Sequence, residues 1–429
     1  MHHVSKLKNG INLITIPVKG TKATTVLVLL PIGSRYEHAK ISGISHFVEH
    51  MMFKGTTKRP TAMDITRELD AVGADFNAFT GKEYTGYYVK IDSAKQELAF
   101  DLLSDMIFNS KMDESEMNKE KGVIVEELRM YEDNPTMFIN RLFDQILLGD
   151  YPLGWDIGGT KQTVTALSSK ELWNYYKSAY IPSNMVLVVA GNIDNKKMKK
   201  FVDQYFANRS VRTVAEKRNK NSFAKFVWPK EKSSINSRVL TQVRKVDQSH
   251  ILLGFPGLAN NHPKRFAAAV MLYILGGGMS SRLFEEVREK RGLAYVINAG
   301  ADSFRDTGMV FVRAGLDPAR LPEALKVIKE ELIKISEEGV TPHELKDAKN
   351  SISGRMALSM EESNVQADWY ARQFWFMREI QTPDDMLKRI RKVTAQEVKG
   401  IAKELFDFDL LHLAAIGPLE KEAILKMIV

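Results

Sequence analysis

The sequence predicts an α+β protein built from two homologous domains, each a mostly antiparallel sheet packed with helices. Three observations indicate this class. Strand-like runs alternate with helix-like segments, the order of segments occurs twice, and 429 residues exceed the roughly 250–300 that one core supports. We expect residues 1–207 and 246–429 to form the two domains, and residues 208–245 to form a polar linker.

The first half begins with strand signals. Residues 24–31, Thr-Thr-Val-Leu-Val-Leu-Leu-Pro, are mostly apolar, as expected for a buried strand. Residues 76–80 and 84–91 flank Gly81-Lys-Glu83, which indicates a hairpin.

Helices and one more strand complete the first half. Asp113 and Glu116 form a capping-box pattern that begins a long helix, and Pro135 marks where that helix has ended. Ser168 begins another helix, and residues 185–190 form an apolar strand that ends at a glycine.

The second half repeats this order at a nearly constant separation. Ser168-Ser-Lys-Glu171 corresponds to Thr394-Ala-Gln-Glu397, and the strand ending at Gly191 to one ending at Gly417; both pairs are 226 residues apart (394 − 168 and 417 − 191). Two further matches lie at separations of 225 and 228 residues. Such agreement predicts a duplicated domain.

Composition excludes several classes of chemistry. The chain has no cysteine, so disulfides, thiolate zinc sites and cysteine nucleophiles are excluded, and any metal must be held by histidines and carboxylates. Neither a signal-peptide pattern nor a run of 18 apolar residues is found, so we expect a cytoplasmic protein without membrane association.

The net charge of +8 raises the alternative of a nucleic-acid-binding protein. Much of the excess lies in residues 208–245, where eleven Lys and Arg face two Glu. No nucleic-acid motif accompanies them, so we favour a solvated basic linker and expect no nucleic-acid partner.

One motif carries metal chemistry. His46, Glu49 and His50 have the spacing i, i+3, i+4, so a helix presents them on one face. Two such imidazoles can chelate a divalent metal, and the carboxylate can act on a bound water. The alternative is a helix with a solvated polar face. The corresponding region of the second half, Ala267–Leu275, is apolar, so the fold can be built without these polar residues.

The long helix of the first half carries candidates for a third metal ligand. Glu120 and Glu127 are two turns apart and share a face, whereas Glu126 points about 100° away from Glu127. Their counterparts 228 residues later are Ala348 and Arg355, so the acidic face is lost together with the histidines. From the residues alone, two interpretations of this acidic face are equally favoured: it supplies a metal ligand, or it is a solvated helix face.

Five motifs together resemble the pitrilysin/insulinase family of zinc peptidases, the inverzincins, in which HxxEH is the order of the metal motif. They are His46-Phe-Val-Glu-His50, Met51-Met-Phe-Lys-Gly-Thr56, Asn77-Ala-Phe-Thr80, Val125-Glu-Glu-Leu-Arg-Met-Tyr131 and Gly276-Gly-Gly-Met-Ser-Ser-Arg-Leu-Phe284. Their wording is most similar to bacterial members akin to the mitochondrial processing peptidase.

The resemblance implies an activity and a site. It implies a metalloendopeptidase with one Zn²⁺ per chain, held by His46, His50 and Glu127. Glu49 is implied as the general base for a zinc-activated water. Glu120 is implied to orient a ligand imidazole from behind.

The resemblance also implies how peptide substrates bind. Asn77, Ala78, Phe79 and Thr80 are implied to form an edge strand to which an extended peptide adds. An ordinary hairpin strand is the alternative.

The second half is implied to contribute substrate contacts. Arg288 and Tyr295 match a family pair that acts near the zinc, so we expect the two domains to face each other across a cleft. Related chains enclose a chamber with four such domains, and this chain has two, so a homodimer, or a heterodimer with a paralogue, is implied. The main alternative is a non-catalytic peptide-binding subunit of the same family, against which the intact site residues argue.

Overall fold

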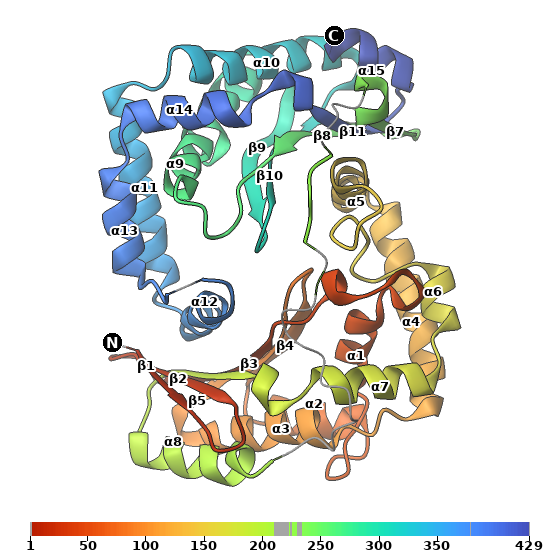
Figure 1. The fold of residues 1–429 in the computed structure, drawn as a ribbon, viewed down its shortest axis with the longest axis vertical. Coiled ribbons are helices and arrows are strands. Elements are labelled where there is room, and N and C mark those ends of the chain that lie inside the picture. Colours follow the sequence, from red (N-terminus) through yellow and green to blue (C-terminus); the bar gives the residue numbers. More distant parts are fainter. Residues whose placement is uncertain (1, 210–222, 224, 230–233, 378, 429) are drawn as a thin grey trace. The chain divides into compact units, whose positions relative to one another are not determined.

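The computed structural model describes residues 2–209, 223, 225–229, 234–377 and 379–428 (Figure 1). The chain divides into two compact units, each assembled from three segments. Unit 1 comprises Met1–Arg129, Trp155–Ala224 and Leu358–Ile380. Unit 2 comprises Met130–Gly154, Lys225–Ala357 and Gln381–Val429.

Unit 1 contains a sheet in the order β1-β2-β6-β3-β5-β4, with six strands among the described residues. The strands are β1 (His3–Lys6), β2 (Asn12–Pro17), β3 (Ala23–Leu30), β4 (Asp75–Thr80), β5 (Thr85–Asp92) and β6 (Val186–Gly191). Only β2 and β6 pair in parallel; the other neighbours are antiparallel. The expected hairpin is β4–β5, and β4 forms an edge of the sheet.

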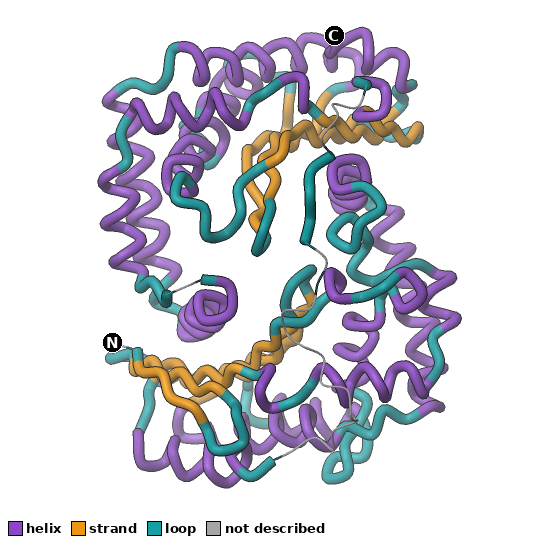
Figure 2. The backbone as a smooth tube through the Cα atoms, viewed as in Figure 1, coloured by secondary structure: helices purple, strands orange, loops and turns teal. Residues whose placement is uncertain are grey.

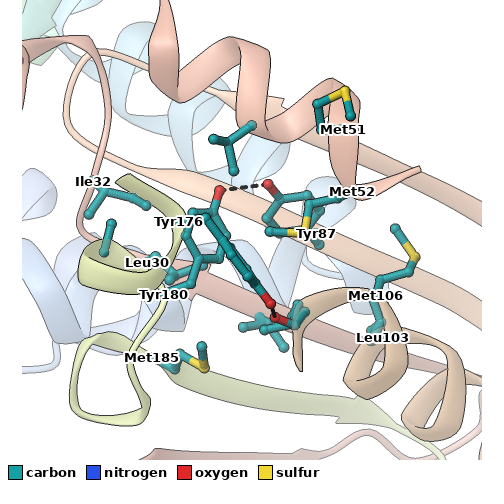
Figure 3. Packing of buried hydrophobic residues seen from close by; sticks show 14 of the residues in the cluster. Leu30, Ile32, Met51, Met52, Tyr87, Leu103, Met106, Tyr176, Tyr180 and Met185 are labelled. Carbon is teal, nitrogen blue, oxygen red and sulfur yellow. Dashed lines mark hydrogen bonds between the residues drawn. The ribbon is translucent and has the colours of Figure 1, made fainter. Parts of the chain in front are cut away.

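Helices cover this sheet on both faces. They are α1 (Ile44–Met52), α2 (Ala62–Asp70), α3 (Gln96–Asn109), α4 (Glu114–Asp133), α6 (Lys161–Ala166), α7 (Ser169–Ala179), α8 (Asn195–Val202) and α12 (Ser363–Phe376). Beneath α1 the core includes a buried pair, Tyr87 and Tyr180, whose hydroxyls lie 2.7 Å apart (Figure 3). Each hydroxyl gives the other a hydrogen-bond partner, so the pair can be buried among apolar side chains.

Unit 2 repeats the topology of unit 1. Its strands are β7 (Val239–Val243), β8 (Ser249–Pro256), β9 (Ala294–Ser303), β10 (Gly308–Leu316) and β11 (His412–Gly417). Their order, β7-β11-β8-β10-β9, corresponds to β2-β6-β3-β5-β4, and again only the first pair, β7 and β11, is parallel. The helices are α5 (Pro135–Leu148), α9 (Arg265–Gly276), α10 (Leu321–Glu337), α11 (Pro342–Ser359), α13 (Pro383–Lys392), α14 (Ala395–Leu405) and α15 (Lys421–Ile428). The predicted α+β class with two homologous, mostly antiparallel sheets is confirmed. Figure 2 shows helices and strands in both units.

The duplication extends to the helix caps. Ser168 and Thr394 both begin their helices in reciprocal capping boxes, with Glu171 and Glu397 as partners. Each box satisfies two backbone N–H groups that have no partner inside the helix. The residues that indicated the repeat therefore cap the corresponding helices in both units.

One helix in each unit comes from the other half of the sequence. In unit 1, α12 packs on β3 and β6, and in unit 2, α5 packs on β8 and β11 (Figure 1). The strands explain why these helices are needed: along β3, Val26 and Val28 face one core while Leu27 and Leu29 face the other. A sheet that is apolar on both faces needs cover on both. This exchange of helices was not predicted from the sequence.

The segment expected as a linker, residues 208–245, is only partly described, because residues 210–222, 224 and 230–233 lie outside the described residues. Its last part is not a linker, since residues 239–243 form β7. Arg238, expected on a solvated basic segment, is buried and donates a hydrogen bond to the Leu411 carbonyl at 3.0 Å. Along the described chain, no helix combines the length and the apolar character that a membrane span requires.

The exchange predicts that the fragment 1–207 is not an independent folding unit. Without residues 358–380, one face of its sheet would expose Ile14, Ile16, Leu27, Leu29, Val186, Val188 and Ala190. We expect the isolated fragment to bind a hydrophobic dye strongly, and a synthetic peptide of residues 358–380 to reduce that binding. The control peptide carries Ala367→Asp and Ala371→Asp, because both alanines are fully buried on the sheet. A fragment that binds no dye and gives dispersed amide resonances alone would contradict this prediction.

Candidate metal centre

The start of α1 is fixed by two residues outside the helix. Gly43 precedes it with a φ of 95°, and a Cβ on this glycine would lie 2.6 Å from the Gly158 carbonyl oxygen, so only glycine fits. The buried Glu37 carboxylate accepts hydrogen bonds from the N–H groups of Gly43 (2.7 Å) and Ser45 (2.8 Å). A negative side chain at this end is favourable, because the first N–H groups of a helix lack internal partners.

The predicted helix over His46, Glu49 and His50 is confirmed. Its apolar residues Phe47, Val48, Met51 and Met52 are fully buried in the core of unit 1, and Figure 3 shows the two methionines packing there. Burial of that stripe leaves the two histidines and Glu49 on the opposite, half-buried face.

The structure brings Glu127 to the two histidines. The Nε2 atoms of His46 and His50 lie 3.2 Å apart, and Glu127 Oε2 lies 3.3 Å from His50 Nε2 and 3.7 Å from His46 Nε2. Ligand atoms around a tetrahedral zinc with bonds of about 2.0–2.1 Å stand roughly 3.3 Å apart. The three side chains therefore fit a zinc ion, and in the part of the chain that the structure describes they are the one such cluster.

Glu120 supports the cluster from behind. It is buried, and its Oε1 lies 2.8 Å from His50 Nδ1 while its Oε2 lies 2.6 Å from Lys54 Nζ. A hydrogen bond donated by Nδ1 fixes the tautomer in which His50 Nε2 offers its lone pair to a metal. The family resemblance implied that Glu120 lies behind a ligand imidazole, whereas the contact with Lys54 was not predicted, because no spacing rule gave a signal for it.

The two histidines differ in their electrostatics. Burial, and then the neighbouring His50, lower the pKa of His46 to about 4. Burial also opposes protonation of His50, but hydrogen bonds with Glu120 and Glu127 outweigh it and raise its pKa to about 9. In the metal-free chain at neutral pH, His50 therefore carries a proton on both ring nitrogens, with the Glu120 carboxylate beside Nδ1 and the Glu127 carboxylate beside Nε2.

Glu49 has a partner from the edge strand. The Thr80 hydroxyl at the end of β4 donates a hydrogen bond to Glu49 Oε2. Burial raises the pKa of Glu49, and the hydrogen bond from Thr80 offsets part of this rise. His50 and Glu127 both act electrostatically on Glu49, which places it beside the cluster. The family resemblance assigned Thr80 to the substrate strand, and its side-chain contact with Glu49 was not predicted.

Arg288 and Tyr295 are brought together in unit 2. Arg288 Nη1 donates a hydrogen bond to the Tyr295 carbonyl at 2.8 Å, and its guanidinium lies 4.7 Å from the Phe284 ring and 5.4 Å from the Tyr295 ring. Tyr295 is 70% exposed. Their action on the site in unit 1 stays a prediction, as does the expected cleft between the domains.

The chain has a duplicated α+β fold, and two helices of its first unit carry a His–His–Glu cluster. These features place it among two-domain proteins with a zinc-type site. Residues 13–161 match the family described as insulinase (peptidase family M16), and residues 166–352 match its "inactive domain". The chain belongs to peptidase family M16, the insulinase family.

Similar proteins support this assignment along nearly the whole chain. The sequence is 36% identical over 419 residues to an uncharacterized zinc protease of Streptomyces coelicolor (96% of this chain, 89% of the relative). It is 34% identical over 411 residues to one of Bacillus subtilis (96% and 97%). These names indicate zinc for relatives of this chain.

Solved structures share the fold at low sequence identity. A protease from Helicobacter pylori superposes with a TM-score of 0.89 at 22% identity (97% of this chain, 99% of that chain). A protein from Pseudomonas fluorescens described as a peptidase M16 inactive domain gives 0.87 at 18% (98% and 98%).

Proposed function

We propose that this chain is a zinc-dependent metalloendopeptidase with one Zn²⁺ per chain. The observation that carries the proposal is the cluster of His46, His50 and Glu127, whose ligand atoms stand 3.2–3.7 Å apart, the spacing of a tetrahedral zinc site with one position open. The zinc-protease names of the relatives support the choice of metal.

Glu49 is suited to proton transfer in this site. Zinc, when bound, supplies a Lewis acid that makes a water acidic near neutral pH. Glu49 accepts the proton of the attacking water and delivers it to the leaving nitrogen of the peptide bond. The raised pKa of Glu49, caused by burial, suits a group that must hold a proton and then release it.

The edge strand β4 offers a place for the substrate. It packs beside α1 and pairs with β5 on one side only, which supports the addition of an extended peptide along Asn77–Thr80 through backbone hydrogen bonds. Binding of this kind depends little on side chains, so peptides and unfolded segments are the proposed substrates.

Further parts of the proposal rest on family resemblance. Arg288 and Tyr295 are proposed to contact the substrate near the zinc, across a cleft between the two domains. A homodimer, or a heterodimer with a paralogue, and membership of the processing-peptidase-like bacterial subfamily are proposed on the same ground. The alternative is a non-catalytic peptide-binding subunit. The description of one family match as an "inactive domain" is consistent with this alternative.

The test combines metal analysis with a peptide assay. Purified protein is analysed for zinc and incubated with a quenched fluorescent peptide library, before and after chelation and after zinc is added back. We expect about one zinc per chain, internal cleavage, loss of activity on chelation and recovery with zinc. Zinc-loaded protein that binds but never cleaves peptides would favour the non-catalytic alternative.

The pKa values of the two histidines predict a proton linkage. Zinc must take the Nε2 position that holds a proton on His50 at pH 7, where its pKa is about 9, whereas His46, with a pKa of about 4, is already neutral. Zinc binding at pH 7 should therefore release about one proton. Because rising pH removes the competing proton, zinc affinity should increase about tenfold per pH unit up to about pH 9 and then level off.

Calorimetry in buffers of different ionisation enthalpy measures this proton release directly. Binding at pH 7 without proton release would contradict the prediction.

A further inference from the structure

We propose that Thr80 is a positioning residue that holds the Glu49 carboxylate in its working orientation. This inference rests on the proposed function and deepens it. The Thr80 hydroxyl donates to Glu49 Oε2 across 31 residues of chain. A fixed donor on one carboxylate oxygen restricts rotation of the carboxylate, which otherwise turns freely at its last torsion.

The end of the hairpin that carries Thr80 is itself held rigidly. Thr80 pairs with Thr85 across the turn, and the turn is closed by the Gly81 N–H donating to the Tyr84 carbonyl at 2.7 Å. The Arg35 N–H donates to the Lys82 carbonyl at 2.9 Å.

A buried ion pair strengthens this anchor. Arg35 Nη1 lies 2.5 Å from Glu83 Oε1, and both side chains are almost fully buried. Two residues further along the chain, Glu37 caps the start of α1. One short segment therefore fixes both the hairpin that supplies the donor and the helix that carries Glu49, so the fold sets their separation.

The second unit provides an internal comparison. There, Ser303 closes the corresponding strand pair opposite Gly308, and its side chain is exposed. The helix corresponding to α1 is the apolar α9, without a carboxylate in its buried stretch. In unit 2 the fold therefore does not use a hydroxyl at this strand end. In unit 1 the hydroxyl of Thr80 contacts the Glu49 carboxylate.

This arrangement gives the edge strand two roles. Its backbone is the proposed binding site for the peptide, and its last side chain orients the group that transfers protons. The peptide and the base are then placed by the same strand, so their relative position depends on few intervening bonds. Misplacement of a catalytic group by about 1 Å can cost about 10²-fold in rate.

The test compares three substitutions in zinc-loaded protein. Thr80→Val keeps the shape and removes the hydroxyl; it should lower kcat about 10- to 100-fold while zinc content and KM stay unchanged. Thr80→Ser keeps the hydroxyl and should restore kcat to within about threefold of the original chain. Thr24→Val removes a buried hydroxyl of β3 that donates to the Asn192 carbonyl, away from the hairpin end, and should leave kcat unchanged.

Several outcomes would overturn this inference. They are an unchanged kcat in Thr80→Val, an equal loss in Thr24→Val, a change in KM alone, or no rescue by serine. If Thr80→Val does not fold, Thr80→Ala provides the same comparison. The unsubstituted chain and Glu49→Gln are assayed in parallel: an inactive, zinc-loaded unsubstituted chain overturns the proposed function, whereas an active one with unaffected Thr80→Val overturns only the role of Thr80.

Discussion

Replacing Glu49 with Gln is expected to lower kcat for peptide hydrolysis by about 10²- to 10⁴-fold, the usual contribution of general acid–base catalysis. The amide has nearly the shape of the carboxylate and can still face Thr80, but it cannot accept the proton of the attacking water. Glu49 is not in the cluster of candidate ligands, so zinc content should remain unchanged. Steady-state assays with a quenched peptide, together with zinc analysis, measure both quantities.

Two outcomes would contradict this assignment. Full activity in Glu49→Gln would show that another group transfers the proton. Loss of zinc would show that Glu49 helps to hold the metal. The same variant, if it keeps zinc and binds peptides without cleaving them, is also a reagent for mapping the peptide on β4 by hydrogen exchange.

Replacing Glu127 with Gln is expected to weaken zinc binding by at least about 100-fold. Loss of an outer-shell partner already costs about 10- to 100-fold, and this substitution removes the one anionic ligand of the cluster. Glu127 Oε2 lies 3.3 Å and 3.7 Å from the two histidine Nε2 atoms, so its neutral replacement leaves two imidazoles as strong ligands. Competition with a chromophoric chelator measures the zinc dissociation constant, and peptide hydrolysis should fall in parallel.

The neighbouring glutamate provides a matched control. Glu126 is on the same helix and has a 67% exposed side chain that pairs with Arg129, about 100° around the helix from Glu127. Glu126→Gln removes the same charge one residue away and should leave zinc affinity unchanged. Equal weakening by the two substitutions would mean that α4 contributes a general acidic field and not a ligand.

The sequence alone determined the features that depend on local spacing. The helix over His46–His50 follows from an apolar stripe and a polar face, which any helix with this order of residues presents. The duplication followed from caps and strand ends, and the structure confirms both, down to the capping boxes at Ser168 and Thr394. The sharing of one helix face by Glu120 and Glu127 is likewise a matter of seven residues and two turns.

Only the tertiary structure decided which separate segments meet. Nothing local to Glu127 distinguishes a candidate metal ligand from a solvated carboxylate. Only the structure shows that Glu127 approaches the two histidines. The same holds for Lys54 behind Glu120 and for Thr80 against Glu49.

The exchanged helices α5 and α12 show the same limit of sequence reasoning. An amphipathic pattern indicates that one face of a helix must be buried, but it does not indicate which sheet buries that face. Strands that are apolar on both faces indicate that helices must cover both faces of the sheet. They do not indicate where in the chain those helices come from. Local order thus fixed the chemistry offered by each helix and strand, and packing between distant segments fixed which groups act together.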